Sequence, residues 1–253
     1  MKKIILLSAA VFISGYLSIN AQDTVPKKQC YFEEHLKTQK ELDPTLESRL
    51  QAQEVATREW IKNNQDYLNS RAVTMIPVAV HIIGSTASSS ISDALVQAEI
   101  NAVNIDYAGQ NPHSMGLFNA NLKASTNIQF CLAKRTPSGA TTSGIERKTT
   151  VSSACTDNDA VKYSAQGGLN AWDVNKYLNI WICYSNVWNG YGVYPTTPLS
   201  SDFGLVMSYD AFGNNIPVNS GGTVTHELGH CLNIAHIWGD ENETHAHSLS
   251  ARD

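Results

Sequence analysis

Two long and almost unbroken apolar runs dominate the pattern of hydrophobic positions along this chain. The first run, Val73–Ile83, has the continuous hydrophobic character of a strand that is buried on both faces. The second, Leu178–Tyr184, is interrupted only by Asn179, so we expect it at the centre of a sheet. Shorter segments predict further strands, the last of them an edge strand because a proline follows it: Asn127–Ala133, Ile145–Thr149 and Tyr191–Tyr194.

Helical spacing of apolar residues appears between these strands. The stretch Ser92–Tyr107 predicts a helix with Ser92 as its N-cap, and the polar stretch Glu47–Asn64 predicts a solvated helix. Strands that alternate with helices indicate an α/β fold with a mixed, mostly parallel sheet. We expect one stripe of the first helix to be buried and a second strip to be covered on its far side. The first stripe is Ala94, Leu95, Ala98, Ala102 and Ile105, and the second is Val96, Ile100 and Val103.

A third helix, near the C-terminus, combines a metal-binding motif with an apolar stripe. The run from His226 to His236 reads H-E-x-x-H-x-x-N-x-x-H. Residues four apart share one face of a helix, so His226 and His230 can direct their ring nitrogens at one cation. Asn233 tolerates the left-handed conformation that ends a helix, which would let the chain return and present His236. The opposite face carries the apolar stripe: Val224, Leu228, Cys231, Leu232 and Ala235.

This spacing predicts a catalytic zinc site. Three neutral imidazoles leave a fourth position of a tetrahedral Zn²⁺ open for water, as in catalytic rather than structural sites. The metal lowers the pKa of that water to about 7, and Glu227 stands close enough to accept its proton without being a ligand. Histidines on a solvated helix face are the alternative, but they would need neither Glu227 nor His236 at this offset.

The same run resembles the extended zinc signature of the metzincin metalloproteases. Further runs are similar to the pappalysin family of secreted metalloproteases: Lys176–Ser185, Gly190–Pro195, Gly204–Gly213 and Thr223–Asp240. The resemblance implies zinc-dependent hydrolysis of peptide bonds, with His226, His230 and His236 as ligands and Glu227 as the catalytic base. It also implies a backing helix, an active-site helix and an edge strand along the upper rim of the cleft.

Two features depart from the family pattern. Asn233 stands where the family usually has glycine, which is a mild change. The family also carries a methionine turn beneath the metal, beyond the third histidine, but no methionine follows Met207. We therefore expect the lower C-terminal subdomain to be largely missing. This leaves open an alternative function, a truncated and catalytically inactive secreted zinc-binding protein.

The N-terminal region predicts export and latency. Two lysines precede the apolar run Ile4–Leu17, which together indicate a signal peptide over residues 1–21. The run is too short to span a membrane. We interpret residues 22–71 as a prosegment and residues 72–253 as an incomplete metalloprotease catalytic domain. Prosegment removal is expected beside Arg71, in a polar junction before the first strand.

The cysteines are odd in number, so at least one is unpaired or pairs with another molecule. The family resemblance includes an N-terminal cysteine that can block the open zinc position, which makes Cys30 a possible zymogen switch. A surplus thiol or a disulfide partner is the alternative reading of Cys30. Cys183 and Cys231 lie in apolar contexts that favour buried thiols. The five cysteines are Cys30, Cys131, Cys155, Cys183 and Cys231.

Composition and net charge limit the classes of molecule that the protein is expected to bind. The 253 residues are 42% hydrophobic and 16% charged, enough for one well-buried domain with extensions. The net charge of −5 argues against nucleic acid, so we expect protein or peptide substrates that extend the sheet at its edge strand. Three less favoured readings concern other residues: a sugar-stacking surface at Trp188, Tyr191 and Tyr194, and extra metal ligands at His81 or at His245 and His247.

Overall fold

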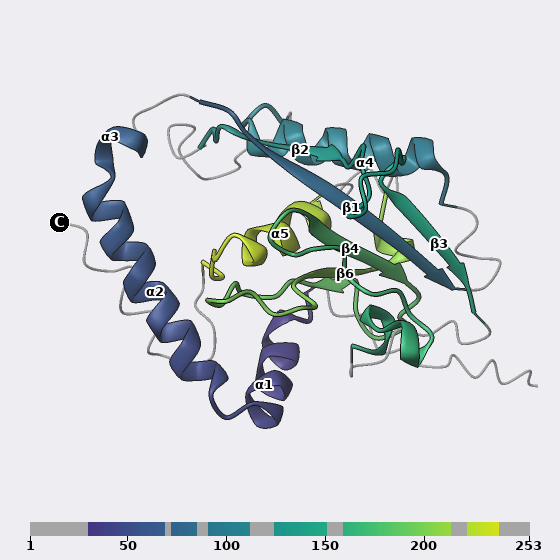
Figure 1. The fold of residues 1–253 in the computed structure, drawn as a ribbon, viewed down its shortest axis with the longest axis horizontal. Coiled ribbons are helices and arrows are strands. Elements are labelled where there is room, and N and C mark those ends of the chain that lie inside the picture. The colour runs from purple at the N-terminus through teal and green to yellow at the C-terminus, as the bar shows by residue number, and fades with distance from the viewer. Residues whose placement is uncertain are drawn as a thin grey trace, which may run out of the picture.

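A six-stranded sheet forms the centre of the protein in the computed structural model (Figure 1), which describes residues 30–68, 72–84, 91–111, 124–150, 159–213 and 222–237. The strand order is β2-β1-β4-β6-β5, and β3 also pairs with β1. The strands are β1 (Thr74–Gly84), β2 (Ile128–Leu132), β3 (Ile145–Thr149), β4 (Leu178–Cys183), β5 (Gly190–Tyr191) and β6 (Gly204–Ser208).

The sheet is parallel except at one edge. The first half of β1 pairs with β2 and its second half with β3, while β4 runs along its other side. β4 pairs in parallel with β6, and β5 closes this edge as an antiparallel strand. The expected α/β fold with a mixed, mostly parallel sheet is therefore confirmed, and so is the edge position of the segment near Tyr191.

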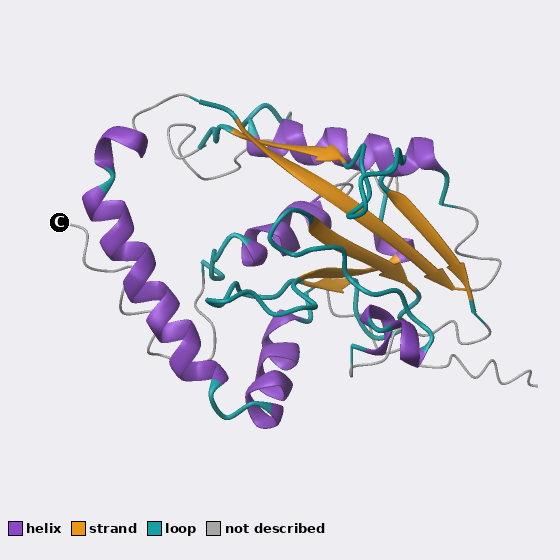
Figure 2. Cartoon of the chain, viewed as in Figure 1, coloured by secondary structure: helices purple, strands orange, loops and turns teal. Residues whose placement is uncertain are grey.

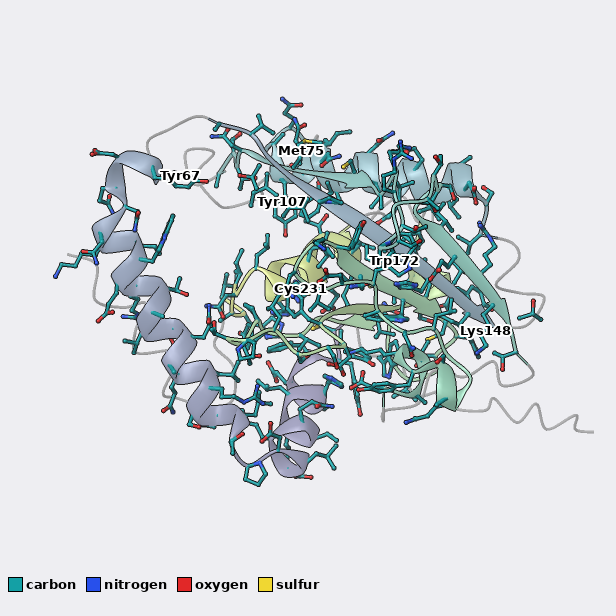
Figure 3. The ribbon with its side chains drawn as sticks, in the orientation of Figure 1. Tyr67, Met75, Tyr107, Lys148, Trp172 and Cys231 are labelled. Atoms are coloured by element: carbon teal, nitrogen blue, oxygen red, sulfur yellow. The ribbon has the colours of Figure 1, made fainter. Side chains whose placement is uncertain are left out.

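Two helices cover one face of the sheet (Figure 2). Helix α4 (Asp93–Tyr107) begins at Ser92, whose hydroxyl accepts a hydrogen bond from the backbone N of Leu95 at 3.1 Å. Helix α5 (Gly222–Cys231) packs beside it, and both share one apolar core with the central strands. Tyr107 projects from α4 toward α5 (Figure 3), where its hydroxyl donates to the carbonyl of Thr225 at 3.3 Å.

The buried face of α4 differs from the expected one. Its buried residues are Val96, Glu99, Ile100, Val103 and Tyr107. The predicted stripe is wrong, because Ala94 and Ala98 are exposed and Ile105 is 44% exposed. The expectation that α4 is covered on both faces is also wrong. A strip of valine and isoleucine removes more apolar area from water than a strip dominated by alanine, so the larger side chains face the sheet.

The opposite face of the sheet is covered by loops and aromatic side chains. Alternation along β4 sends Ile180 and Ile182 toward the helices and Trp181 and Cys183 toward this second face. Trp188 and Tyr191 are fully buried and Tyr194 is 8% exposed, which supports packing rather than a sugar-binding surface.

His81 of β1 belongs to the sheet and not to the metal motif. Its ring is fully buried and lies within 2.9 Å of Asn179 Oδ1 and 3.0 Å of Glu146 Oε2. Both ring nitrogens therefore have partners inside the fold, as expected for a core histidine.

Three helices precede the sheet: α1 (Phe32–Leu42), α2 (Leu46–Asn63) and α3 (Gln65–Leu68). Helix α1 contacts β5, whereas α2 extends away from the sheet (Figure 1). The polar stretch from residue 47 was expected to be helical, and α2 confirms it, but α1 was not expected. No described helix has the length and apolar character needed to cross a bilayer.

Several expectations fall outside the described residues: the signal peptide, the cut beside Arg71, Cys155, and the tail with His245 and His247. The cysteines that are described divide into two kinds. Cys183 is in a disulfide, so the buried thiol expected there is wrong. Cys231 is a buried free thiol, as expected, and Cys30 and Cys131 are also free.

Candidate metal centre

The three histidines of the motif converge on one point. Nε2 of His226 lies 3.2 Å from Nε2 of His230 and 3.2 Å from Nε2 of His236. In a tetrahedral zinc site with Zn–N bonds of about 2.0–2.1 Å, ligand nitrogens are separated by about 3.3–3.4 Å. The spacing of the three imidazoles thus fits a single Zn²⁺ ion, and three nitrogen donors are the ligand type that zinc prefers.

Contacts behind the ligands orient two of the rings. Nδ1 of His230 lies 2.9 Å from the carbonyl oxygen of Ile234, and Nδ1 of His236 lies 3.1 Å from Oε1 of Glu33. An acceptor at Nδ1 favours the tautomer whose Nε2 carries the lone pair, as metal binding requires. Burial lowers the pKa of His226, with a smaller contribution from His236, and so favours the neutral ring that can bind a cation.

The turn after α5 brings the third histidine back to the other two. Asn233 adopts φ 65°, the left-handed conformation expected for this position. The backbone N of Asn233 donates to His230 O at 2.9 Å, and that of Ile234 donates to Gly229 O at 2.9 Å. These two bonds form a Schellman motif, which ends the helix and reverses the chain. His236 consequently faces His226 from below the helix end.

Glu227 lies within the same helix turn but points at the rim of the sheet. Its side chain is fully buried, and Oε2 accepts a hydrogen bond from the backbone N of Gly192 at 2.8 Å. Oε1 has no hydrogen-bond partner among the described residues. Burial raises the pKa of Glu227 to about 8, although the bonds from Cys30 and Gly192 oppose the shift. A buried carboxylate oxygen without a partner beside three imidazoles is suited to accept a hydrogen bond from water.

Gly192 allows the rim to approach α5 this closely. A Cβ atom at this position would lie 2.3 Å from Glu227 O and 2.9 Å from His230 Cβ. Any other residue would push the chain after β5 away from the helix and lengthen the bond to Glu227. The run Gly190–Pro195 is similar to the pappalysin family, but the steric need for glycine at position 192 follows only from the position of α5.

A fourth potential ligand comes from the N-terminal segment. Cys30 Sγ lies 3.7 Å from His230 Nε2 and 3.6 Å from Glu227 Oε2. The ligand atoms of Cys30, His226, His230 and His236 all lie within 4.8 Å of one another. With a Zn–S bond of about 2.3 Å, a sulfur and a nitrogen ligand would be about 3.6 Å apart. Burial raises the pKa of the Cys30 thiol, and the nearby Glu227 carboxylate raises it further.

Residues adjoining Cys30 make further contacts with the motif that the sequence did not reveal. Phe32 is 1% exposed and stacks on His230 with ring centroids 4.0 Å apart. It also packs edge-on against Tyr194 at 4.5 Å. The backbone N of Tyr31 donates to Gly190 O on the edge strand at 2.8 Å. The helical spacing of Phe32, His35, Leu36 and Gln39 was the available signal for the face of α1 that makes contact.

Beside the histidines lies a pocket of about 390 Å³. It is bounded by α4 and by the turn after α5, and its walls include Tyr107, His226, Gly229 and Ile237. Ile237 is 89% exposed and Ile234 is 55% exposed. The space next to the imidazoles can therefore receive an apolar group.

Proteins that are similar to this chain are metalloproteases, in agreement with the metal centre that the three histidines form. The family model Peptidase_M43, described as pregnancy-associated plasma protein-A, matches residues 162–249. A mutant of Tannerella forsythia promirolysin is 31% identical, with a TM-score of 0.68 over 84% of this chain and 71% of its own. The chain belongs to the Peptidase_M43 family.

A second structure of this family is also similar. Mature mirolysin of Tannerella forsythia, in complex with a cleaved peptide, is 37% identical with a TM-score of 0.63, covering 67% of this chain and 67% of its own. None of the curated proteins matches the chain. Membership of the Peptidase_M43 family makes this protein a metalloprotease with a metzincin-like fold.

Proposed function

We propose that the protein is a secreted zinc endopeptidase, made as a latent precursor, that hydrolyses peptide bonds of extracellular proteins or peptides. The observation that carries this proposal is the convergence of three imidazoles beside the buried carboxylate of Glu227, whose Oε1 has no partner among the described residues. His226, His230 and His236 would hold the metal, and Glu227 would be the catalytic base.

Only a few residues take part directly in the proposed reaction. Zinc, when bound, supplies a Lewis acid that polarises the scissile carbonyl and lowers the pKa of water. Glu227 accepts the proton of the attacking water and delivers it to the leaving amine. The bond from Gly192 N to Oε2 leaves Oε1 for this transfer. The edge strand β5 would bind the substrate main chain as an added strand, which suits peptides of varied sequence.

Residues 22–71 would act as the prosegment, with Cys30 as its switch. Cys30 Sγ approaches His230 Nε2 at 3.7 Å, so a thiolate there would take the position that water needs. The comparisons support this division. The promirolysin mutant covers 84% of this chain and mature mirolysin covers 67%, as expected if this chain shares its N-terminal helices with the pro-form.

Two further steps complete the proposal. The apolar run Ile4–Leu17 behind two lysines would export the protein, with cleavage after Ala21. A later cut beside Arg71 would then separate the helical segment from the catalytic domain. N-terminal sequencing of the secreted protein checks both steps, and a mature start far from residues 69–74 would overturn the second.

A digestion assay tests the activity. We expect the processed protein to contain one zinc per chain and to digest casein or gelatin, and to lose digestion with a chelator and regain it with added zinc. Elemental analysis reports the metal independently of turnover. Stoichiometric zinc without digestion by the processed, metal-replete chain would instead indicate the inactive zinc-binding protein, and absence of zinc would refute both functions.

A further inference from the structure

Asp159 is a buried carboxylate outside the metal centre. It is 4% exposed and adopts φ 59°, a left-handed conformation that is uncommon for residues other than glycine. Its Oδ1 accepts a hydrogen bond from the hydroxyl of Tyr191 at 2.7 Å and lies 2.9 Å from Nζ of Lys162. The catalytic domain thus supplies partners for one oxygen of this carboxylate.

The other oxygen is bonded by the N-terminal segment. Oδ2 of Asp159 accepts a hydrogen bond from Nε2 of Gln39 at 3.0 Å and lies 3.4 Å from Nε2 of His35. Both residues belong to α1. Within the part of the chain that the structure describes, Oδ2 would therefore lose these two partners when the proposed prosegment leaves.

The pocket around Oδ2 is shaped for a flat side chain. The His35 ring is 3% exposed and stacks on the Tyr191 ring with centroids 4.2 Å apart and an angle of 25°. Lys162 Nζ lies 5.5 Å from the centroid of the same tyrosine ring and balances the charge of Asp159. The flat, stacked position of the His35 ring beside Oδ2 favours a hydrogen-bond donor on a planar group.

This pocket is continuous with the proposed substrate cleft. Tyr191 belongs to the edge strand β5, and the neighbouring Gly190 O accepts the backbone N of Tyr31 at 2.8 Å. A cavity of about 160 Å³ lies along the same boundary, with Asp159, Gly192 and Tyr194 in its wall. A peptide bound along β5 would therefore pass the opening of the pocket.

We propose that the Asp159–Tyr191 pocket is a substrate subsite for a planar nitrogen-donor side chain, namely histidine, glutamine, asparagine or arginine. It rests on the proposed function. In the latent chain His35 and Gln39 occupy this subsite, and on their departure Oδ2 loses both partners and opens toward the cleft, where a bound substrate side chain would cover it again. A substrate residue that donates to Oδ2 restores the lost bond, whereas leucine or valine leaves it unmet. A buried acceptor without a partner is costly, so we expect discrimination of about tenfold or more.

The first arm of the test needs no catalysis. In the full-length chain, we measure how fast Cys30 reacts with a thiol reagent in the variants His35→Leu, His35→Gln and Lys37→Leu. Leucine removes one of the two donors at Oδ2 and leaves only that of Gln39, so Cys30 should react several times faster, whereas glutamine should preserve the slow rate. Lys37 is exposed on the same helix and is the matched control. Equal rates for leucine and glutamine at position 35 would overturn donor recognition by the pocket.

The second arm profiles cleavage of a peptide library by the processed protein. We expect one position relative to the cut bond to favour the four donor residues by lower KM, and Asp159→Asn to flatten the preference at that position while the other positions keep theirs. Cleavage without such a position, or a preference unchanged in Asp159→Asn, would overturn the subsite. If this variant does not fold, the wild-type profile alone decides. No cleavage of any peptide would instead refute the proposed protease function, and the first arm would still decide donor recognition.

Discussion

The backbone N of Gly192, directly after β5, donates a hydrogen bond to Oε2 of Glu227 on α5 at 2.8 Å. This contact connects the edge of the sheet to the helix that carries the motif. The bond fixes Oε2 at the rim, while Oε1 has no partner among the described residues. The space available at Gly192 is smaller than a methyl group.

Substitution of Gly192 by alanine should therefore damage the site. The added Cβ would meet Glu227 O at 2.3 Å and must displace the rim. We expect stability to fall by about 1–3 kcal/mol and peptide cleavage to fall at least about tenfold, with thermal unfolding and turnover as measurements. Gly222→Ala is the matched control, because a Cβ there meets nothing within 4 Å. Unchanged turnover in Gly192→Ala would show that the close approach has no role.

Removal of the Glu227 carboxylate should separate metal binding from turnover. In Glu227→Ala the three imidazoles remain, so we expect one zinc per chain by elemental analysis. Peptide cleavage should fall by about 10²–10⁴-fold, the usual contribution of a general base. Glu146→Ala, a carboxylate that contacts His81 and not the motif, is the control. Retained cleavage in the metal-replete variant would remove Glu227 from the mechanism.

Loss of the Cys30 thiol should shorten latency. In Cys30→Ala the N-terminal segment keeps the packing of Phe32 but loses the sulfur that lies near His230. We expect the full-length variant to cut peptides while it retains residues 22–71, or to process itself several times faster than the wild type. The control Cys131→Ala removes another free thiol. A lag in peptide cleavage identical to that of the wild type would assign latency to the helices and not to the thiol.

Glu99 makes stability depend on pH in a region away from the ligands. Burial raises the pKa of Glu99 to about 7, with opposition from the backbone bond of Gly213 and a smaller increase from Asp106. Because the pKa of Glu99 in the folded protein exceeds the ordinary value of about 4.5, the native state binds more protons than the unfolded state between about pH 4.5 and pH 7. The contribution to stability is full below about pH 4.5 and is lost as the pH rises through 7.

The variant Glu99→Gln should remove this dependence, since glutamine stays neutral. Compared with the wild type, it should gain stability between pH 5 and pH 8 by at most about 3 kcal/mol, measured by urea unfolding at both values. Glu41→Gln, on an exposed position of α1, controls for the loss of one charge. A constant stability difference between Glu99→Gln and the wild type across this range would contradict the shift.

The left-handed turn at Asn233 predicts opposite effects of two substitutions. Glycine adopts φ 65° without strain, so Asn233→Gly should preserve or slightly raise the melting temperature. Asn233→Val should cost about 1–2 kcal/mol and weaken zinc retention, because His236 follows this turn. Zinc loss in a chelator series measures the second effect, and equal retention by the two variants would contradict it.

The sequence predicted the elements whose residue patterns reflect their own surroundings. Continuous apolar character placed β1 and β4 at the centre of the sheet, and the spacing of His226, His230 and His236 predicted the convergence now seen. The turn at Asn233 was predictable for the same reason, because its conformation depends on the residue itself.

Other features depend on partners that lie far away in the chain. The buried side of α4 was predicted wrongly because two apolar strips competed and only the sheet decides between them. The steric need for Gly192 and the contacts of Asp159 with α1 likewise involve residues distant in sequence. Periodicity within one segment contains no information on such pairs.

The contacts of the N-terminal segment have a consequence for activation. Three residues within positions 30–33 contact the imidazoles: Cys30 Sγ lies 3.7 Å from Nε2 of His230, Phe32 stacks on the ring of His230, and Glu33 Oε1 lies 3.1 Å from Nδ1 of His236. So short a stretch cannot detach from one imidazole while it still holds another. Activation should therefore be a concerted event, and a maturing population should contain only fully silent and fully competent molecules, without species of intermediate strength.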